Sequence, residues 1–297
     1  MKNNIWIIGC GDIGKRVAKL HQNEKISGIV QSESSVLACN ELGINVNLVD
    51  FDQEIKLPDL LSQPSLQSLQ PSSQAPEIYY FMPPPQMGCE DTRIQQFLSS
   101  LNQIVPKRIV LISTTGVYGD SKGGWVDEAS PVQPKADRAY RRLSAEKALI
   151  NWSNKTGGEY MILRVPGIYA EDRLPLARLK KGLPIVRLEE AGWTNRIHAD
   201  DLAQACKAAM ACDTSNQVIN VSDGHPSTMT DYFNQIADYA NLERPRQISM
   251  KKAEETLSAG MVSYLKESRR IRNDKMLTLL GIKLKYPNLS FFIKAKN

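Results

Sequence analysis

Short apolar runs alternate with segments of helical period along the first two thirds of the chain. The run at residues 4–9, "NIWIIG", leads into a glycine-rich turn, after which Ile13, Val17 and Leu20 recur at helical spacing. This spacing predicts an amphipathic helix, whereas a short uninterrupted apolar run predicts a strand that is buried on both faces. Further apolar runs predict five more strands, at residues 25–31, 45–51, 78–82, 107–114 and 158–166.

Helical patterns at residues 92–104 and 139–154 lie between the later strands. Buried strands that alternate with helices form a parallel sheet with helices on both faces. We therefore expect an α/β fold, a Rossmann-type doubly wound parallel sheet with a smaller C-terminal substrate lobe. The Ser-, Gln- and Pro-rich residues 58–76 predict a crossover with at most a short helix and a loose surface loop.

The pattern becomes turn-rich after Pro166, although helical and strand patterns return at residues 200–212 and 216–223. This mixture predicts a lobe that is interwoven with the last elements of the sheet. The expected division is a dinucleotide-binding Rossmann domain at 1–168 plus 197–223, and a smaller substrate-binding lobe at 169–196 and 224–297.

The turn after the first strand reads "GCGDIG", a GxGxxG motif at residues 9–14. Such glycines permit a tight turn, a close approach of the backbone to a pyrophosphate, and close helix packing, while the helix N-terminus attracts the phosphates. A glycine turn can also be merely a turn, but its place between strand and helix favours a dinucleotide site. The expected cofactor contacts here are Gly9, Gly11, Asp12, Ile13 and Gly14.

The end of the second strand lacks the acidic residue that binds the ribose hydroxyls of NAD in such folds. Gln31 and Ser32 occupy this place, and Glu33 follows. We expect Gln31 and Ser32 to contact the cofactor. Without the acid a 2′-phosphate meets no repulsion, and Lys15 or Arg16 could supply positive charge. The expected cofactor is therefore NAD(P), with NADP slightly favoured, unless Glu33 reaches the ribose.

Hydroxyl side chains follow the fifth strand, at the carboxyl edge where ligands bind in open α/β sheets. The ordered set "GCGDIG", "STTGVYGD", a tyrosine at 140, "RVPGIY", "NRIHADDLA" and "NVSDG" resembles the extended short-chain dehydrogenases/reductases of the NAD-dependent epimerase/dehydratase type. The chain looks most similar to their atypical branch, over nearly its whole length. The resemblance implies a small polar substrate, for example a nucleotide-linked one, and a homodimer built on the two helices that flank the active-site strand.

The resemblance also implies two catalytic residues. Thr114 would polarise the substrate and Tyr140 would exchange a proton with it. A phenol ordinarily has a pKa of about 10, so positive charge must lower it by roughly three units, or about 4 kcal/mol. The family places a lysine four residues after the tyrosine, and this chain has Ser144 there. Arg141 points a quarter-turn away on a helix, and Lys147 returns to nearly the same face as Tyr140, about 10 Å further along.

The same family resemblance implies roles for other positions. Asp50 and Phe51 match the pair beside the adenine, and Met82 and Pro83 match the adenosine cleft, although these two could equally close a strand in a rigid turn. Arg187 and Arg196 are candidates to hold an anionic substrate, with surface charge as the alternative. The remaining expected contacts are Ser113, Tyr140 and Pro166 for the cofactor and Tyr118 for the substrate.

The stretch "NRIHADDLAQA" contains acids beside a histidine. We interpret Asp200 as a helix N-cap and Asp201 as a residue of the positive first turn. His198 is then expected to be a packed structural residue rather than a catalyst or metal ligand. We predict no metal site.

The composition is that of a globular protein, because 42% of the 297 residues are hydrophobic and 23% are charged. The net charge of +5 is mild, and no basic block with interleaved aromatics predicts a nucleic-acid partner. The basic stretch 266–276 is interpreted as the solvated face of a helix. Five cysteines without a CxxC pair, and no membrane-length or signal-like apolar run, predict a cytoplasmic protein that has reduced thiols and no membrane partner.

Two functions therefore remain open from the sequence. The first is an NAD(P)-dependent oxidoreductase or epimerase with an incomplete Tyr-Lys pair, which Thr114 and Tyr140 favour. The second is a catalytically inactive NAD(P)-binding regulator or scaffold, which Ser144 favours.

Overall fold

A seven-stranded sheet forms the centre of the protein. The computed structural model describes residues 4–52, 75–101 and 104–296, so the predicted crossover at 58–76 lies outside the described residues except for its last two positions. All neighbouring strands are parallel, in the order β12-β7-β5-β4-β1-β2-β3. The strands are β1 (Asn4–Ile8), β2 (Lys25–Val30), β3 (Asn45–Leu48), β4 (Glu77–Tyr80), β5 (Arg108–Thr114), β7 (Tyr160–Val165) and β12 (Gln217–Asn220).

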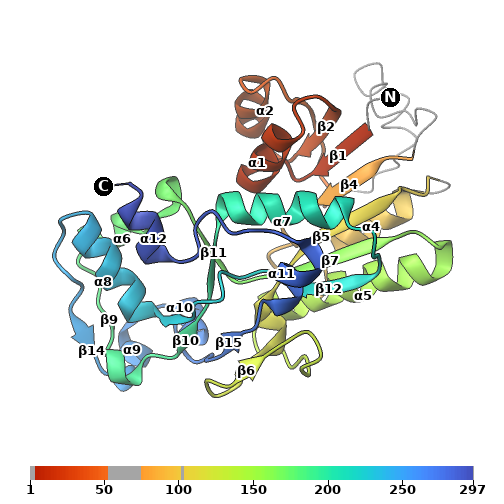
Figure 1. Cartoon of the computed structure of the whole chain (residues 1–297). Coiled ribbons are helices and arrows are strands. Elements are labelled where there is room, and N and C mark those ends of the chain that lie inside the picture. Colours follow the sequence, from red (N-terminus) through yellow and green to blue (C-terminus); the bar gives the residue numbers. More distant parts are fainter. Residues whose placement is uncertain (1–3, 53–74, 102–103, 297) are drawn as a thin grey trace.

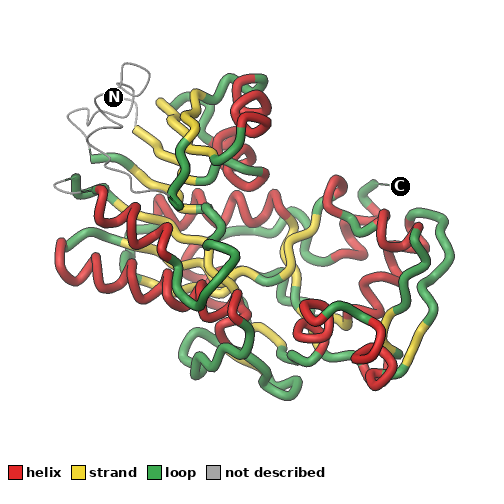
Figure 2. The backbone as a smooth tube through the Cα atoms, turned by 180° about the vertical axis from the view of Figure 1, so that it is seen from behind, coloured by secondary structure: helices red, strands yellow, loops and turns green. Residues whose placement is uncertain are grey.

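Helices cover both faces of this sheet (Figures 1 and 2). Val17, Leu202 and Met276 are buried on one face, whereas Phe97 and Leu149 are buried on the other. The first face carries α1 (Asp12–Leu20), α2 (Glu33–Asn40), α7 (Ala199–Ala211) and α11 (Asp274–Leu280); the second carries α4 (Thr92–Ser100) and α5 (Asp137–Thr156). The expected Rossmann-type fold is thus confirmed.

The strand order reverses at β1, which pairs with β2 on one side and with β4 on the other. In open α/β sheets the carboxyl ends of the strands at such a reversal border the ligand crevice. The glycine-rich turn lies directly after β1, so the fold brings it to this crevice.

A smaller lobe lies beside the sheet (Figure 1). It has an apolar cluster of its own, in which Tyr169, Phe233 and Phe292 are buried. Its strands pair two by two: β8 (Gly167–Tyr169) with β11 (Arg196–His198), β9 (Ile185–Val186) with β14 (Gln247–Ile248), and β10 (Trp193–Thr194) with β13 (Ser227–Thr228). Its helices are η3 (Glu171–Arg173), α6 (Leu176–Lys180), η4 (Leu188–Glu190), α8 (Met229–Tyr239), α9 (Met250–Thr256), α10 (Ala259–Leu265) and α12 (Leu289–Lys294).

The C-terminal segment departs from the sequence-based expectations. Residues 266–276 do not form one helix, because β15 (Arg270–Ile271) pairs in parallel with β6 (Trp125–Val126), and α11 begins only afterwards. Ile271 is fully buried. The domain boundary at residue 224 does not hold for α11, since its Met276 is buried in the core beneath the sheet. No helix among the described residues is long and apolar enough to span a bilayer.

Candidate functional site

The three glycines of the turn after β1 have different surroundings. A Cβ on Gly9, whose φ is +87°, would lie 2.5 Å from the backbone nitrogen of Met82. A Cβ on Gly14 would lie 3.0 Å from Ile7 Cγ2, whereas one on Gly11 would meet nothing within 4 Å. The first glycine therefore lets the chain ends of β1 and β4 touch, and the third lets α1 pack on β1. Gly11 faces open space, which fits the close backbone approach that a dinucleotide pyrophosphate needs.

Ion pairs connect the start of α1 to other elements. Asp12 accepts hydrogen bonds from Arg16 Nε at 2.9 Å and from Arg173 Nη1 at 2.8 Å, and Arg16 Nη1 also donates to Asp200 Oδ1 at 2.5 Å. Burial raises the pKa of Asp12, but Arg173 and Arg16 outweigh it and hold that pKa below its usual value. Arg16 is thus engaged with α7, so our expectation that it offers charge to a 2′-phosphate is wrong.

Arg93, in the first turn of α4, joins the ends of three strands. Its Nη1 donates to Gln31 Oε1 at 3.3 Å and to the Pro83 carbonyl at 3.0 Å, and its Nε donates to Asp52 Oδ1 at 2.6 Å. The Arg93 side chain is 12% exposed, and its hydrogen bond holds the pKa of Asp52 below the usual value. This cation lies beside the position where the sequence places the cofactor ribose. Arg93 was not among the cations expected there, which were Lys15 and Arg16.

Of the residues expected to lie near the adenosine, Ser32 and Asp50 are on the surface and Phe51 is in the core. Ser32 caps α2 by accepting a hydrogen bond from Ser35 N at 3.3 Å, and exposed Asp50 accepts one from Asp52 N at 2.9 Å. The Phe51 side chain is instead fully buried and meets Phe97 edge-on, with ring centroids 6.2 Å apart. The expected adenine contact of Phe51 therefore cannot come from its side chain.

The two hydroxyl side chains at the end of β5, Ser113 and Thr114, differ in whether they can bind a ligand. Thr114 is half-buried, and its Oγ1 accepts a hydrogen bond from Gly116 N at 3.1 Å, which leaves its own O–H free to donate. The buried Ser113 hydroxyl donates to Glu146 Oε1 at 2.5 Å. Thr114 is accordingly the hydroxyl that can face a ligand, whereas Ser113 is bonded to the α5 side of the core.

Beneath these hydroxyls lies a buried polar network. Arg164 donates two hydrogen bonds to Glu146, at 2.7 and 3.1 Å, and a third to the Tyr118 oxygen at 3.0 Å. The Tyr118 hydroxyl donates to Asn220 Oδ1 at 2.8 Å. Burial raises the pKa of Tyr118, although Arg164 acts in the opposite direction. The expected substrate contact of Tyr118 is wrong, because its side chain is buried within this network.

Tyr140 points away from the sheet. The buried side chains of α5 include Ala145 and Leu149, and at about 100° per residue Tyr140 lies about half a turn around the helix from Leu149. Tyr140 is 44% exposed and lines an open depression together with Ser144 and Lys147. Lys147 thus shares the face of Tyr140, as the spacing predicts. The pairing of Tyr140 with Thr114, and the cofactor contact expected of Tyr140, are wrong because this side of α5 faces outward.

The side of α5 opposite to Tyr140 carries Arg138, Arg142 and Glu146, which follow one another at intervals of four residues. Arg142 Nη1 donates to the Met82 carbonyl at 3.2 Å, at the end of β4. Arg138 Nη1 donates to Ser263 Oγ of the lobe at 3.4 Å. Neither arginine was expected at the site, although their four-residue spacing back from Glu146 was a signal for one helical face.

A small cavity of about 20 Å³ lies between the strand ends and the lobe. Pro166, an expected cofactor contact, lines it directly after β7. Thr115 lines it at the end of β5, where the helix η2 (Thr115–Tyr118) begins. The lobe contributes the other lining residues, which are Trp193, Thr194, Asn195, Tyr264, Glu267 and Arg269.

Neither arginine expected to hold an anion lines this cavity. Arg196 is buried, lies 3.7 Å from the centre of the Tyr232 ring, and donates to Thr194 Oγ1 at 2.8 Å. Arg187 is half exposed, 3.9 Å from Glu190 Oε1. The substrate role of Arg196 is thus corrected to packing, since aromatic and polar neighbours enclose its guanidinium.

His198 is a structural residue, as expected. It is the N-cap of α7, with its Nδ1 accepting from Asp200 N at 3.1 Å, so Asp200 is not the N-cap that we expected. Tyr286 and Phe292 surround the ring, and burial lowers the pKa of His198 to about 4. Among the described residues, no group of three His, Cys, Asp or Glu could hold a metal ion.

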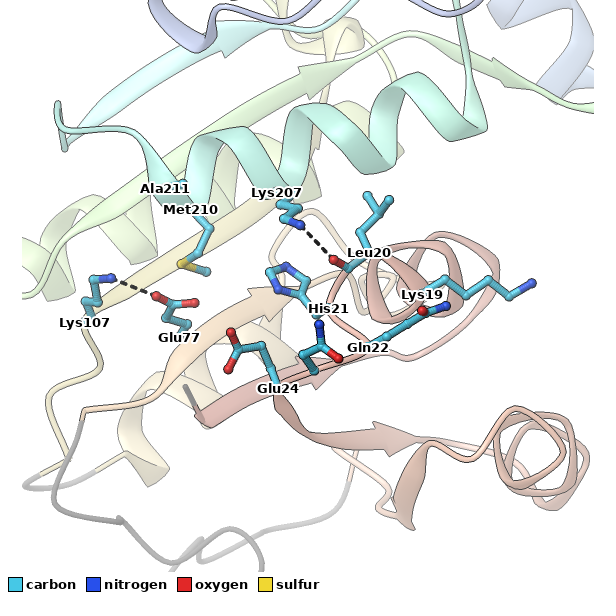
Figure 3. A pocket seen from close by; sticks show the side chains of 11 residues that line it. Lys19, Leu20, His21, Gln22, Glu24, Glu77, Lys107, Lys207, Met210 and Ala211 are labelled. Atoms are coloured by element: carbon cyan, nitrogen blue, oxygen red, sulfur yellow. Dashed lines mark hydrogen bonds and ion pairs between the residues drawn. The ribbon is translucent and has the colours of Figure 1, made fainter. Parts of the chain in front are cut away.

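Another hollow, of about 480 Å³, lies at the opposite, amino edge of the sheet (Figure 3). Its charged side chains bond within it, since Lys107 Nζ donates to Glu77 Oε1 at 2.8 Å and Lys207 Nζ to the Leu20 carbonyl at 2.7 Å. It is separate from the glycine turn and from the carboxyl ends of the strands, so we do not include it in the candidate site.

Comparisons with known proteins agree with this geometry. The sequence profile of the NAD dependent epimerase/dehydratase family matches residues 94–222. A candidate UDP-glucose 4-epimerase from Methanocaldococcus jannaschii is 25% identical over 138 residues, which cover 42% of this chain and 45% of that protein. The chain therefore matches less than half the length of this relative.

Solved structures extend the likeness to the whole chain. A protein of unknown function from Silicibacter pomeroyi is 26% identical with a TM-score of 0.82, covering 99% of this chain and 98% of that one. UDP-glucuronic acid 4-epimerase from Bacillus cereus, solved with UDP-glucuronic acid and NAD, has a TM-score of 0.75 at 17% identity over 99% and 97% of the two chains. Residues 94–222 thus resemble the NAD dependent epimerase/dehydratase family, and the whole chain shares the fold of these solved structures.

Proposed function

We propose that the protein is an NAD(P)-dependent oxidoreductase or epimerase that acts on a small polar, nucleotide-linked substrate. The observation that carries this proposal is the open space in front of Gly11, at the reversal of strand order that borders the ligand crevice in such sheets. The Bacillus cereus structure, with NAD and a UDP-sugar, supports the ligand classes.

The residues that would hold the dinucleotide follow from the glycine turn. Gly11 and the start of α1 would face the pyrophosphate, and Gln31 and Ser32 would meet the ribose. When bound, the nicotinamide would supply hydride exchange. Thr114 would donate its O–H to the substrate oxygen and polarise it.

A slight preference for NADP remains part of the proposal, and its support now comes from Arg93. This guanidinium touches Gln31, where a 2′-phosphate would lie, but Asp52 already offsets part of its charge. The preference over NAD is therefore proposed to be small.

The second candidate, an NAD(P)-binding protein without turnover, is favoured by the outward direction of Tyr140. The deciding experiment titrates the protein with NADH and NADPH by fluorescence and then assays a panel of UDP- and TDP-sugars. Dinucleotide binding with turnover supports the enzyme, and binding without turnover supports the second candidate. No binding of either dinucleotide overturns both.

We also propose a homodimer through α4 and α5, whose outer face carries the depression beside Tyr140. Light scattering after size exclusion tests it: a monomer at micromolar concentration would contradict this part of the proposal.

A further inference from the structure

The cavity beside Pro166 is small and polar. Its volume of about 20 Å³ accommodates about one water-sized group. Thr115 and Pro166 approach it from the carboxyl ends of β5 and β7, and Tyr264 and Glu267 approach it from the lobe. A single hydroxyl group of a substrate would fit there.

Glu267 has one carboxylate oxygen without a partner. The residue is 7% exposed, and its Oε2 accepts a hydrogen bond from Arg269 Nη1 at 2.8 Å. Its Oε1 is buried and has no hydrogen-bond donor among the described residues. Buried polar atoms are almost always paired, because an unpaired one has lost its water without compensation. Glu267 Oε1 therefore needs a donor, and the cavity is where a donor can be accommodated.

The segment that carries Glu267 is held in place on both sides. Asn195 donates from Nδ2 to the Arg269 carbonyl at 3.0 Å and accepts at Oδ1 from Ile271 N at 2.8 Å. Arg269 Nη1 also donates to the Gly119 carbonyl at 2.5 Å. The carboxylate is thus preorganised, since its ion-pair partner is tied to the loop after η2.

Tyr264 brings a phenol to the same cavity. Its oxygen lies 3.8 Å from the position that a Cβ on Gly167 would occupy, directly after Pro166. The Arg138 guanidinium lies 5.8 Å from the centre of the Tyr264 ring, so α5 and α10 meet next to the cavity. A phenol can donate a hydrogen bond to an oxygen whose own hydrogen is donated elsewhere.

We propose that Glu267 and Tyr264 form a subsite that recognises one hydroxyl group of the substrate, a sugar hydroxyl of a nucleotide-linked sugar. The hydroxyl donates to Glu267 Oε1 and accepts from the Tyr264 phenol. An ionised carboxylate or a phosphate does not suit the subsite, because the cavity accommodates about one water-sized group and Glu267 Oε1 needs a hydrogen-bond donor. This inference rests on the proposed function and names the part of the lobe that selects the substrate.

The test measures binding to the full chain by calorimetry in the presence of saturating NAD⁺, with UDP-glucose and UDP as probes. Glu267→Gln and Tyr264→Phe are compared with the wild type and with the controls Glu189→Gln and Tyr140→Phe. Glu189 is an exposed glutamate of the same lobe, and Tyr140 faces outward on α5. Tyr264→Phe breaks no hydrogen bond among the described residues, so it tests the subsite even if Glu267→Gln does not fold.

We expect both subsite variants to bind UDP-glucose at least about tenfold more weakly, with the affinities for UDP and NAD⁺ unchanged, because only the sugar reaches the cavity. The controls should match the wild type. The subsite is overturned if Tyr264→Phe binds UDP-glucose as tightly as the wild type does, or if it loses as much affinity for UDP as for UDP-glucose. Either result leaves the proposed function intact. A wild type that binds neither NAD⁺ nor NADP⁺ overturns the proposed function instead. One that binds the dinucleotide but none of a panel of UDP- and TDP-sugars overturns the substrate class and the subsite together.

Discussion

The glycine turn after β1 and the cavity beside Pro166 are built in different ways. On the glycine side, six consecutive residues, 9–14, set the turn, the open approach and the helix start. Around the cavity, the polar groups come from Thr115 at the end of β5 and from Tyr264 and Glu267 of the lobe, which meet because distant segments pair, as β6 does with β15. Local sequence thus specifies the glycine turn proposed for the dinucleotide, whereas long-range packing specifies the cavity proposed for the substrate.

The largest effect is expected from Gly9→Ala, on the glycine side. Its Cβ would lie 2.5 Å from Met82 N at a φ of +87°. Backbone strain of about 1–3 kcal/mol and overpacking of a similar size should lower the free energy of unfolding by about 2–6 kcal/mol. Urea unfolding measures this change. A variant as stable as the wild type would show that β1 and β4 do not approach so closely.

Gly11→Ala should separate binding from folding on the same turn. No atom lies within 4 Å of the added Cβ, so the free energy of unfolding should change by less than about 1 kcal/mol. The methyl group would instead crowd the pyrophosphate, and overpacking of about 1–3 kcal/mol weakens NADH binding by roughly five- to 150-fold. Fluorescence titration measures the affinity for NADH, and urea unfolding measures the free energy of unfolding. Unchanged NADH affinity would contradict the placement of the dinucleotide.

Arg93→Ala should change the choice of cofactor. If Arg93 attracts a 2′-phosphate, its loss should weaken NADPH binding by about tenfold, or about 1.4 kcal/mol, and NADH binding far less. Asp52→Asn is the matched variant, because it removes the carboxylate that offsets Arg93 and should strengthen NADPH binding. Equal losses for both dinucleotides in Arg93→Ala would remove the support for NADP.

The last prediction concerns the lobe side and the pH dependence of stability. Burial lowers the pKa of His198 to about 4 in the folded protein, from about 6.5 in the unfolded chain. The unfolded state therefore takes up a proton first, and stability should fall as the pH drops from about 6.5 to about 4. His198→Asn keeps an N-cap without this titration, so its stability should decline less in that window. Urea unfolding at several pH values measures the free energy of unfolding of both proteins. An equal decline in the wild type and in His198→Asn would contradict the assignment of the pH dependence to His198.

What could be predicted from the sequence also differs between these two regions. Strands and the glycine turn could be predicted, because apolar runs and GxGxxG are local patterns. The direction of Tyr140 could not be predicted, since the inward face of α5 includes Arg142 and Glu146, and charged residues ordinarily indicate a solvated face. Glu267 was hidden for the same reason, in a basic stretch that resembled a surface helix.

The central claim is that the dinucleotide lies along the glycine turn while the lobe, not the outer face of α5, contacts the substrate. A crystal structure with NAD⁺ and UDP-glucose tests it most directly. We expect the pyrophosphate beside Gly11 and one sugar hydroxyl within hydrogen-bond distance of Glu267 Oε1, with Tyr140 in contact with neither ligand. A sugar bound beside Tyr140, or a dinucleotide away from Gly11, would contradict it.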